Sequence, residues 1–156
     1  MSKPDSQDIS RFDRFFAIES NNEFWSLSEG DLGGGDKQQL LALAFSSLYH
    51  WARVGTEDNV QLANLAIARA FCITELPIGL QYAEMAYEHF NGKGEDWIQA
   101  FTNAILSHAL LIVGEDVRSG ELYETAIEFQ SKLSEGDRKV FDATFSLIPV
   151  PQSLNM

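Results

Sequence analysis

A helix-pair unit occurs twice in this chain, and this repeat constrains the fold more than any other feature of the sequence. Residues 63–90 and 102–130 each contain a long apolar segment, a short break, and a second segment with small residues on one side. One such pair leaves its own apolar stripe uncovered, so the pairs are expected to stack on one another. The aligned positions, 39 apart in each case, are Asn64 with Asn103, Arg69 with His108, and Ala70 with Ala109.

Capping residues, glycines and prolines divide the whole chain into helical segments. The predicted helices cover about residues 7–25, 36–55, 57–74, 77–90, 95–114, 117–133 and 135–147. No stretch alternates with period two for long enough to predict a strand. Four residues are predicted N-caps because their side-chain oxygens can accept hydrogen bonds from free N–H groups: Ser6, Asp36, Thr56 and Ser134. Gly55 is a predicted left-handed helix stop, and Gly114 is predicted to close the helix that precedes it.

These segments predict an all-α fold, a right-handed stack of three antiparallel helix pairs plus a C-terminal capping helix. The length of 156 residues suits one helical-repeat domain over residues 1–156. Three consecutive glycines predict a mobile loop at residues 28–35, and prolines predict an irregular tail at residues 149–156.

The formal net charge of −12 limits the classes of partner. A charge of this size repels phosphate backbones and anionic membrane surfaces, so we expect no nucleic acid and no membrane partner. A protein or peptide partner is expected to be basic. The N-terminus lacks the apolar run of a secretion signal, and the longest apolar run, residues 109–113, cannot span a bilayer. We therefore expect a cytoplasmic protein.

Several motifs resemble tetratricopeptide-type repeats. The segments LQYAEMAYEHF and LYETAIEF are similar to the second helix of that repeat. More narrowly, about residues 40–149 resemble a group of bacterial tetratricopeptide-like proteins with no assigned function. The motifs that carry this resemblance are His50-Trp51, Val54-Gly55-Thr56 with Asn59, Ala68-Arg69-Ala70-Phe71, Ala100-Phe101, Asp137-Arg138 with Phe141, and Ile148-Pro149. The resemblance implies a fold and no reaction. It departs at Ser107-His108-Ala109, where relatives tend to carry Ala-Arg-Ala.

Six residues are the predicted partner-binding set: His50, Trp51, Asn64, Arg69, Asn103 and His108. The first helices of stacked pairs line the concave surface, so Asn64 and Asn103 are expected to form a ladder there. Arg69 lies five residues after Asn64, which is about 140° around the helix beyond one turn, and so belongs to an adjacent strip. The alternative is that the asparagines and the two basic residues tie neighbouring repeats together. For His50, the alternative is a helix-end residue that satisfies free carbonyls and packs on Trp51.

The predicted function is a non-enzymatic module that binds a protein or peptide on its concave face. No nucleophile with a paired base stands out, so no catalytic residue is predicted. No cofactor or metal is predicted either, since the three histidines lack metal-ligand spacing and Cys72 is the single cysteine. One alternative is a small-molecule-binding or enzymatic domain with a pocket around His50, Arg69 and His108. A second alternative is a structural subunit that self-associates.

Aromatic residues in the first helix predict a homodimer. Phe12, Phe15 and Phe16 follow a stripe that the second helix is expected to cover. Phe24 and Trp25 lie beside the glycine loop and are expected to be exposed. Exposed aromatic rings beside a flexible segment are typical of an interface, here with the first helix and the end of the second at the contact. The alternative is that these rings close the N-terminal end of the stack.

Overall fold

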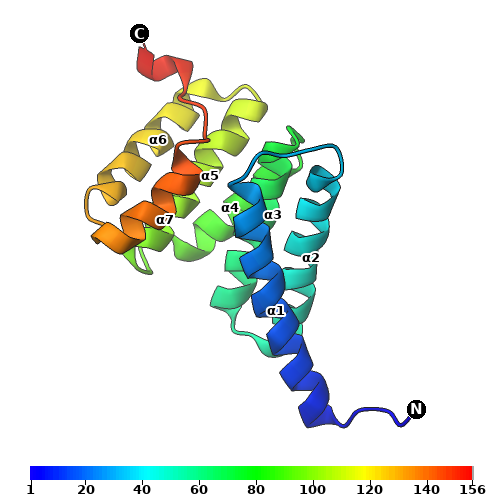
Figure 1. The fold of residues 1–156 in the computed structure, drawn as a ribbon. Helices are drawn as coiled ribbons and strands as arrows, with labels where there is room; N and C mark the ends of the chain where they lie inside the picture. The colour runs from blue at the N-terminus through cyan, green and yellow to red at the C-terminus, as the bar shows by residue number, and fades with distance from the viewer. Residues whose placement is uncertain (156) are drawn as a thin grey trace.

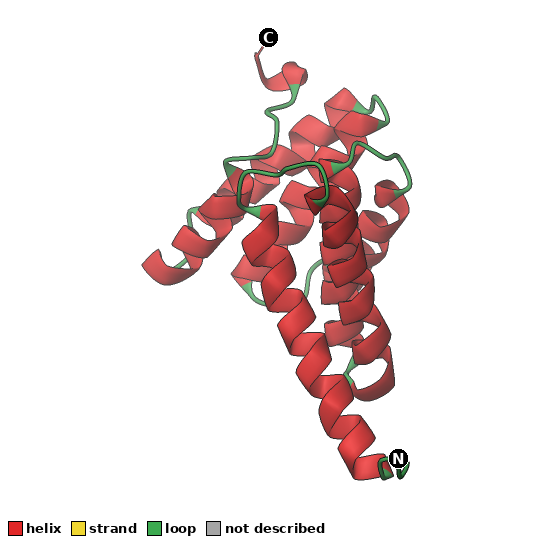
Figure 2. Ribbon diagram, turned by 45° about the vertical axis from the view of Figure 1, so that its right-hand side comes forward, coloured by secondary structure: helices red, strands yellow, loops and turns green. Residues whose placement is uncertain are grey.

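The computed structural model describes residues 1–155, and within this range it contains helices and no β-strand (Figures 1 and 2). The elements in chain order are α1 (Ser6–Ser28), α2 (Asp36–Val54), α3 (Glu57–Ile73), α4 (Gly79–Phe90), α5 (Asp96–Ile112), α6 (Asp116–Gln130), α7 (Glu135–Phe145) and the 3-10 helix η1 (Gln152–Asn155). The all-α prediction is therefore confirmed for the described residues. In that same range, every helix is too short or too polar to cross a membrane.

Neighbouring helices pack on one another along the chain. The pairs α1–α2, α3–α4 and α5–α6 make the main contacts, and α2–α3 and α4–α5 join one pair to the next. The alternate helices also meet, since α3 contacts both α1 and α5, and α5 contacts α7. In Figure 1, α1 and α7 lie toward the viewer, while α3 lies behind them. The contacts α1–α3, α3–α5 and α5–α7 therefore form a continuous row of alternate helices.

Within each repeat unit, the two helices pack closely at equivalent positions. A Cβ atom on Gly79 would lie 2.8 Å from Phe71 Cβ and 3.3 Å from the Ala68 carbonyl oxygen, so α3 and α4 pack closely only with glycine there. Ser119, 40 positions after Gly79, donates its hydroxyl to the Ser107 carbonyl at 2.7 Å. Ser107 in turn lies 39 positions after Ala68. The sequence repeat is thus also a repeat of helix packing.

The turns inside the two units also match. Glu75 has a φ of 58° and Gly114, 39 positions later, has a φ of 84°. In both turns the next residue donates its N–H to the carbonyl five positions earlier, at 2.9 Å. This left-handed helix stop suits glycine, whereas a residue with a Cβ atom is strained there by about 1 kcal/mol. The prediction for Gly114 is confirmed, and Glu75 fills the same position at a conformational cost.

Two of the predicted helix caps, Thr56 and Ser134, are confirmed. Thr56 accepts a hydrogen bond from the Asn59 N–H at 3.3 Å and forms a capping box, and Ser134 accepts from the Asp137 N–H at 3.2 Å. The prediction for Ser6 is wrong, because Asp5 caps α1 by accepting from the Asp8 N–H at 2.8 Å.

Two further predictions at the ends of α2 are wrong. Asp36 is the first residue of α2 rather than its cap, and its carboxylate accepts the Gly33 N–H at 2.7 Å. Gly55 is extended, with a φ of −91°, because the chain passes directly into the extended N-cap of α3. A Cβ atom on Gly55 would lie 2.7 Å from Trp51 Cε3, so close approach rather than a left-handed turn requires glycine.

The two segments predicted to be irregular differ from each other. Residues 29–35 form a loop, one residue shorter than predicted because Ser28 still belongs to α1; its mobility stays a prediction. The tail is not irregular throughout, because residues 152–155 form η1 and the Asp116 carboxylate accepts N–H groups of Gln152 and Ser153 at 3.0 and 2.6 Å. The last predicted tail residue, Met156, lies outside the described residues.

Candidate functional site

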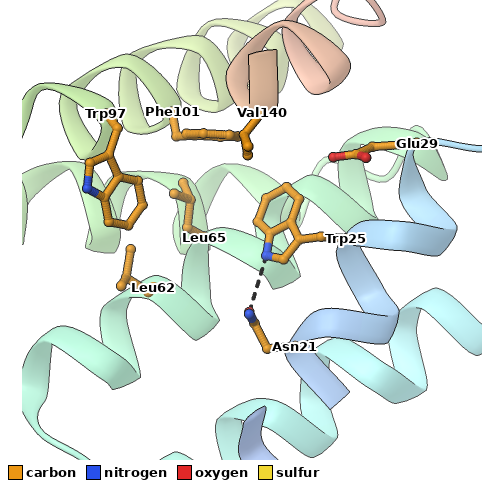
Figure 3. Close-up of a pocket in the computed structure, with 8 residues that line it drawn as sticks. All are labelled: Asn21, Trp25, Glu29, Leu62, Leu65, Trp97, Phe101 and Val140. Carbon is orange, nitrogen blue, oxygen red and sulfur yellow. Dashed lines mark hydrogen bonds between the residues drawn. The ribbon is translucent and has the colours of Figure 1, made fainter. Parts of the chain in front are cut away.

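A cavity of about 230 Å³, here called the central pocket, lies between α1 and α7 with α3 and α5 behind it (Figure 3). Its walls therefore come from the row of alternate helices. Six of its lining residues are aliphatic or aromatic: Trp25, Leu62, Leu65, Trp97, Phe101 and Val140. The other two are Asn21 and Glu29.

Helical spacing explains why these side chains meet. Residues three or four positions apart share one face of a helix. The lining residues follow this spacing in three segments: Asn21 and Trp25 on α1 with Glu29 directly after its end, Leu62 and Leu65 on α3, and Trp97 and Phe101 on α5. Leu62 and Phe101 are also 39 positions apart, so they are equivalent in the two units.

The aromatic rings of the central pocket are held by hydrogen bonds and by each other. Trp25 Nε1 donates to Asn21 Oδ1 at 3.2 Å, as the dashed line in Figure 3 shows, and Trp97 Nε1 donates to Glu95 Oε2 at 2.8 Å. Phe101 packs edge to face with both indoles, with ring centroids 5.6 Å from Trp25 and 6.4 Å from Trp97. Both indole donors are thus satisfied within the protein, and the rings form walls.

Arg69 and His108 lie seven residues after Leu62 and Phe101, so they continue the same two stripes beyond the pocket. Arg69 Nη1 donates to His108 Nδ1 at 3.2 Å, which joins α3 to α5. Burial and the Arg69 charge together lower the pKa of His108 to about 4. At neutral pH the imidazole is therefore neutral and accepts the hydrogen bond from the guanidinium.

Arg69 is only 3% exposed, and its Nε has no hydrogen-bond partner among residues 1–155. Burial lowers the pKa of Arg69, while the nearby charge of Glu29 acts in the opposite direction. The pKa of Glu29 is raised overall, because partial burial raises it more than the Arg69 charge lowers it. The charges of Arg69 and Glu29 therefore stabilise each other at the end of the pocket.

His50 belongs to a separate cluster between α1 and α2. The buried Asp13 carboxylate accepts hydrogen bonds from His50 Nδ1 at 2.7 Å and from Arg53 Nε at 2.8 Å. The hydrogen bonds from Arg53 and then His50 lower the pKa of Asp13 below its ordinary value. Trp51 lies next to this cluster, with the Arg14 guanidinium 5.9 Å from its ring. These contacts join the first two helices and lie outside the central pocket.

The structure brings together two of the three residues that the enzymatic alternative places in one pocket. Arg69 and His108 are hydrogen-bonded to each other and join α3 to α5. His50 instead bonds to Asp13 and joins α2 to α1. The three residues therefore belong to two separate side-chain clusters.

The predicted asparagine ladder is not formed either. Asn64 and Asn103 are each 3% exposed. Asn64 Nδ2 donates to Gln61 Oε1 at 3.1 Å, and Asn103 Nδ2 donates to the Gln99 carbonyl at 2.8 Å. Each amide thus bonds within its own helix, and no hydrogen bond joins the two among the described residues. Buried amides of this kind satisfy the interior and are out of reach of a partner.

The exposure of the aromatic residues on α1 is the reverse of the prediction. Phe24 is fully buried, and Trp25 lies in the central pocket against Phe101. The three rings that were expected to be covered are exposed by about half: Phe12 by 45%, Phe15 by 54% and Phe16 by 47%.

The register of α1 against α2 accounts for the exposure of Phe12. Ser20 Oγ lies 2.9 Å from Ser46 Oγ, and Arg14 Nη2 donates to the Val54 carbonyl at 3.2 Å. Because Val54 ends α2, the turns of α1 before Arg14 extend past their partner helix, and Phe15 and Phe16 lie directly after this point. Figures 1 and 2 both show this end of α1 projecting from the other helices.

No protein family matches this chain, and no curated protein or solved structure is significantly similar to it. The proposed function is therefore based on the geometry of the central pocket. Sequence reasoning singled out Arg69 and His108 but missed the wall residues Leu62, Trp97 and Val140. The sequence does contain a pattern that indicates part of this wall, since Leu62 lies seven residues before Arg69 and Phe101 lies seven residues before His108.

Proposed function

We propose that this protein is a non-enzymatic interaction module that holds a protein or peptide partner against the central pocket. The observation that carries the proposal is the origin of the pocket walls, which come from α1, α3, α5 and α7. In stacked helix pairs the alternate helices line the concave surface, and extended concave surfaces are the usual binding sites of such proteins. We further propose that the pairs form a right-handed stack of the tetratricopeptide type, like that of the bacterial proteins the sequence resembles.

The size of the central pocket favours a side chain of a larger partner as its occupant. Its volume of about 230 Å³ is small, because pockets that enclose a drug-sized molecule measure roughly 300–1,000 Å³. The pocket also has exposed residues at its edge, since Val140 is 60% exposed. A partner lying across α1 and α7 would place one side chain in the pocket and the rest of its surface on these helices.

Charge favours a basic partner. The chain carries a formal net charge of −12, and Glu29 is the charged residue among the eight that line the pocket. Long-range attraction would speed association with a basic surface and would weaken as the salt concentration rises. An affinity that stays constant between low and high ionic strength would contradict this part of the proposal.

Two exposed valines provide the test. Val140→Arg adds bulk and positive charge at the edge of the pocket, whereas Val117→Arg makes the same change on α6, where Val117 is 70% exposed. Both variants should fold, because neither side chain is buried. Proteins captured from native lysate by the wild type should be retained by Val117→Arg and lost by Val140→Arg. Retention by Val140→Arg, or repeated capture of nothing by the wild type, would refute the proposal.

We also propose self-association through the projecting end of α1, since its exposed phenylalanines favour it. A shallow apolar depression is lined by Arg11, Phe12, Phe15 and Phe16. The ring centroid of Phe16 lies 5.6 Å from that of His50 near the end of α2. Light scattering at micromolar concentration should give a mass near twice 17.4 kDa. Phe15→Ser should shift the mass to that of a monomer, while Ile127→Ser on α6 should not. A wild-type mass of one chain removes the dimer.

A further inference from the structure

We infer that the central pocket is an aromatic cage for a cation, namely the alkylammonium or guanidinium group of a lysine or arginine side chain on the partner. This inference rests on the proposed function and names the chemistry of the group that the pocket would take. It depends on two observations, the arrangement of the rings and the sign of the nearby charge.

The rings form walls at steep angles to each other. Phe101 makes interplanar angles of 67° with Trp25 and 81° with Trp97. In Figure 3 the two indoles lie on either side of Leu65, with Phe101 above Leu65 and beside Val140. The face of an aromatic ring carries negative potential, and a cation within about 6 Å of the ring centroid is attracted to it. Tryptophan is the strongest of the aromatic residues in this respect.

The carboxylates around the pocket have the matching sign. Glu29 lines the pocket directly, and Glu95 accepts the hydrogen bond from the Trp97 indole N–H at 2.8 Å. Arg69 has the opposite sign, but its side chain is 3% exposed and lies beyond the eight lining residues. An aliphatic side chain in the same space would gain no charge interaction with the Glu29 carboxylate or with the ring faces. A cation satisfies both the rings and the carboxylate.

Choline and its uncharged isostere 3,3-dimethylbutan-1-ol provide the test, because they share a shape and differ in charge. Binding to the full-length protein is measured by NMR shifts of the Trp25 and Trp97 indole N–H groups. We expect choline to bind in the millimolar range and about fivefold more tightly than the alcohol. Glu29→Gln, at an exposed side chain, should weaken choline binding without changing alcohol binding.

The third tryptophan supplies the matched control. Trp97→Leu should weaken choline binding, whereas Trp51→Leu should leave it unchanged, since Trp51 packs against Arg14 outside the pocket. Circular dichroism of each variant establishes that it is folded. Equal affinity for choline and the alcohol, or no choline-dependent shift, overturns the cation inference. Those results leave the Val140→Arg capture experiment to decide the proposed function separately.

Discussion

Replacing His108 with asparagine should change how the stability of this protein depends on pH. The side chain accepts a hydrogen bond from Arg69 Nη1 through Nδ1, at 3.2 Å. An asparagine oxygen can accept in nearly the same place, so His108→Asn keeps the acceptor and removes the titrating group. The pKa of His108 falls from 6.5 to about 4 on folding, because of burial first and the Arg69 charge second.

The size and sign of the effect follow from proton linkage. Between pH 6.5 and pH 4 the unfolded chain binds a proton at His108 that the folded chain does not. Acid therefore stabilises the unfolded state, and the free energy of unfolding decreases as the pH falls. At about 1.4 kcal/mol per pH unit, the contribution of His108 between pH 7 and pH 5 is a loss of about 2 kcal/mol. Above pH 6.5 the contribution of His108 to the free energy of unfolding is fully present.

Urea denaturation of both proteins at pH 7, 6 and 5 measures this loss. Subtracting the unfolding free energy of the variant from that of the wild type removes the contributions of other titrating groups. One of these is Glu29, whose raised pKa makes the protein more stable as the pH falls. The free-energy difference between the two proteins should change by about 2 kcal/mol over this range. Parallel pH profiles for the two proteins, or a His108 imidazole that titrates by NMR near 6.5, would refute the reasoning.

Three further outcomes are expected. Glu75→Gly should raise the free energy of unfolding by about 1 kcal/mol, since Gly114 fills the matching left-handed position; a lower urea midpoint would contradict this. Gly79→Ala should lower it by about 1–3 kcal/mol, because the new Cβ would lie 2.8 Å from Phe71 Cβ; an unchanged midpoint would count against the close packing. Cys72 is 1% exposed and burial raises its thiol pKa to about 12, so a disulfide reagent at pH 8 should label it only in urea; rapid labelling of the native protein would show that the site opens.

The helices were predictable because the signals that begin and end them are local. The capping box of Thr56 and Asn59 needs residues only three positions apart, and the stop at Gly114 needs one residue of unusual backbone freedom. The cap of α1 was misassigned by one residue, since Asp5 and Ser6 carry equally suitable oxygens. Errors at this level move a boundary and leave the fold unchanged.

The candidate site was less predictable because it depends on how helices are offset. Nothing local indicates that α2 ends opposite Arg14, and that register decides whether Phe12 or Phe24 is covered. The same holds for Asn64 and Arg69, whose spacing shows that they differ in direction but not that both are buried. Arg69 and His108 occupy equivalent positions on the first helices of neighbouring units. The sequence repeat therefore indicates that these two residues can pair, as they do in the structure.

The position of α7 affects how the binding region can be mapped by truncation. Val140 contributes one wall of the pocket from near the C-terminal end, while Trp25 contributes another from the first helix. Helix α7 is attached through Phe141, which packs edge to face with Phe101 of α5 at a centroid distance of 5.1 Å and stacks on Phe145 of its own helix at 4.8 Å. A fragment shortened at either end therefore loses part of the same cavity. Loss of binding in two non-overlapping deletions would indicate one composite site assembled from both ends of the chain, rather than two separate epitopes.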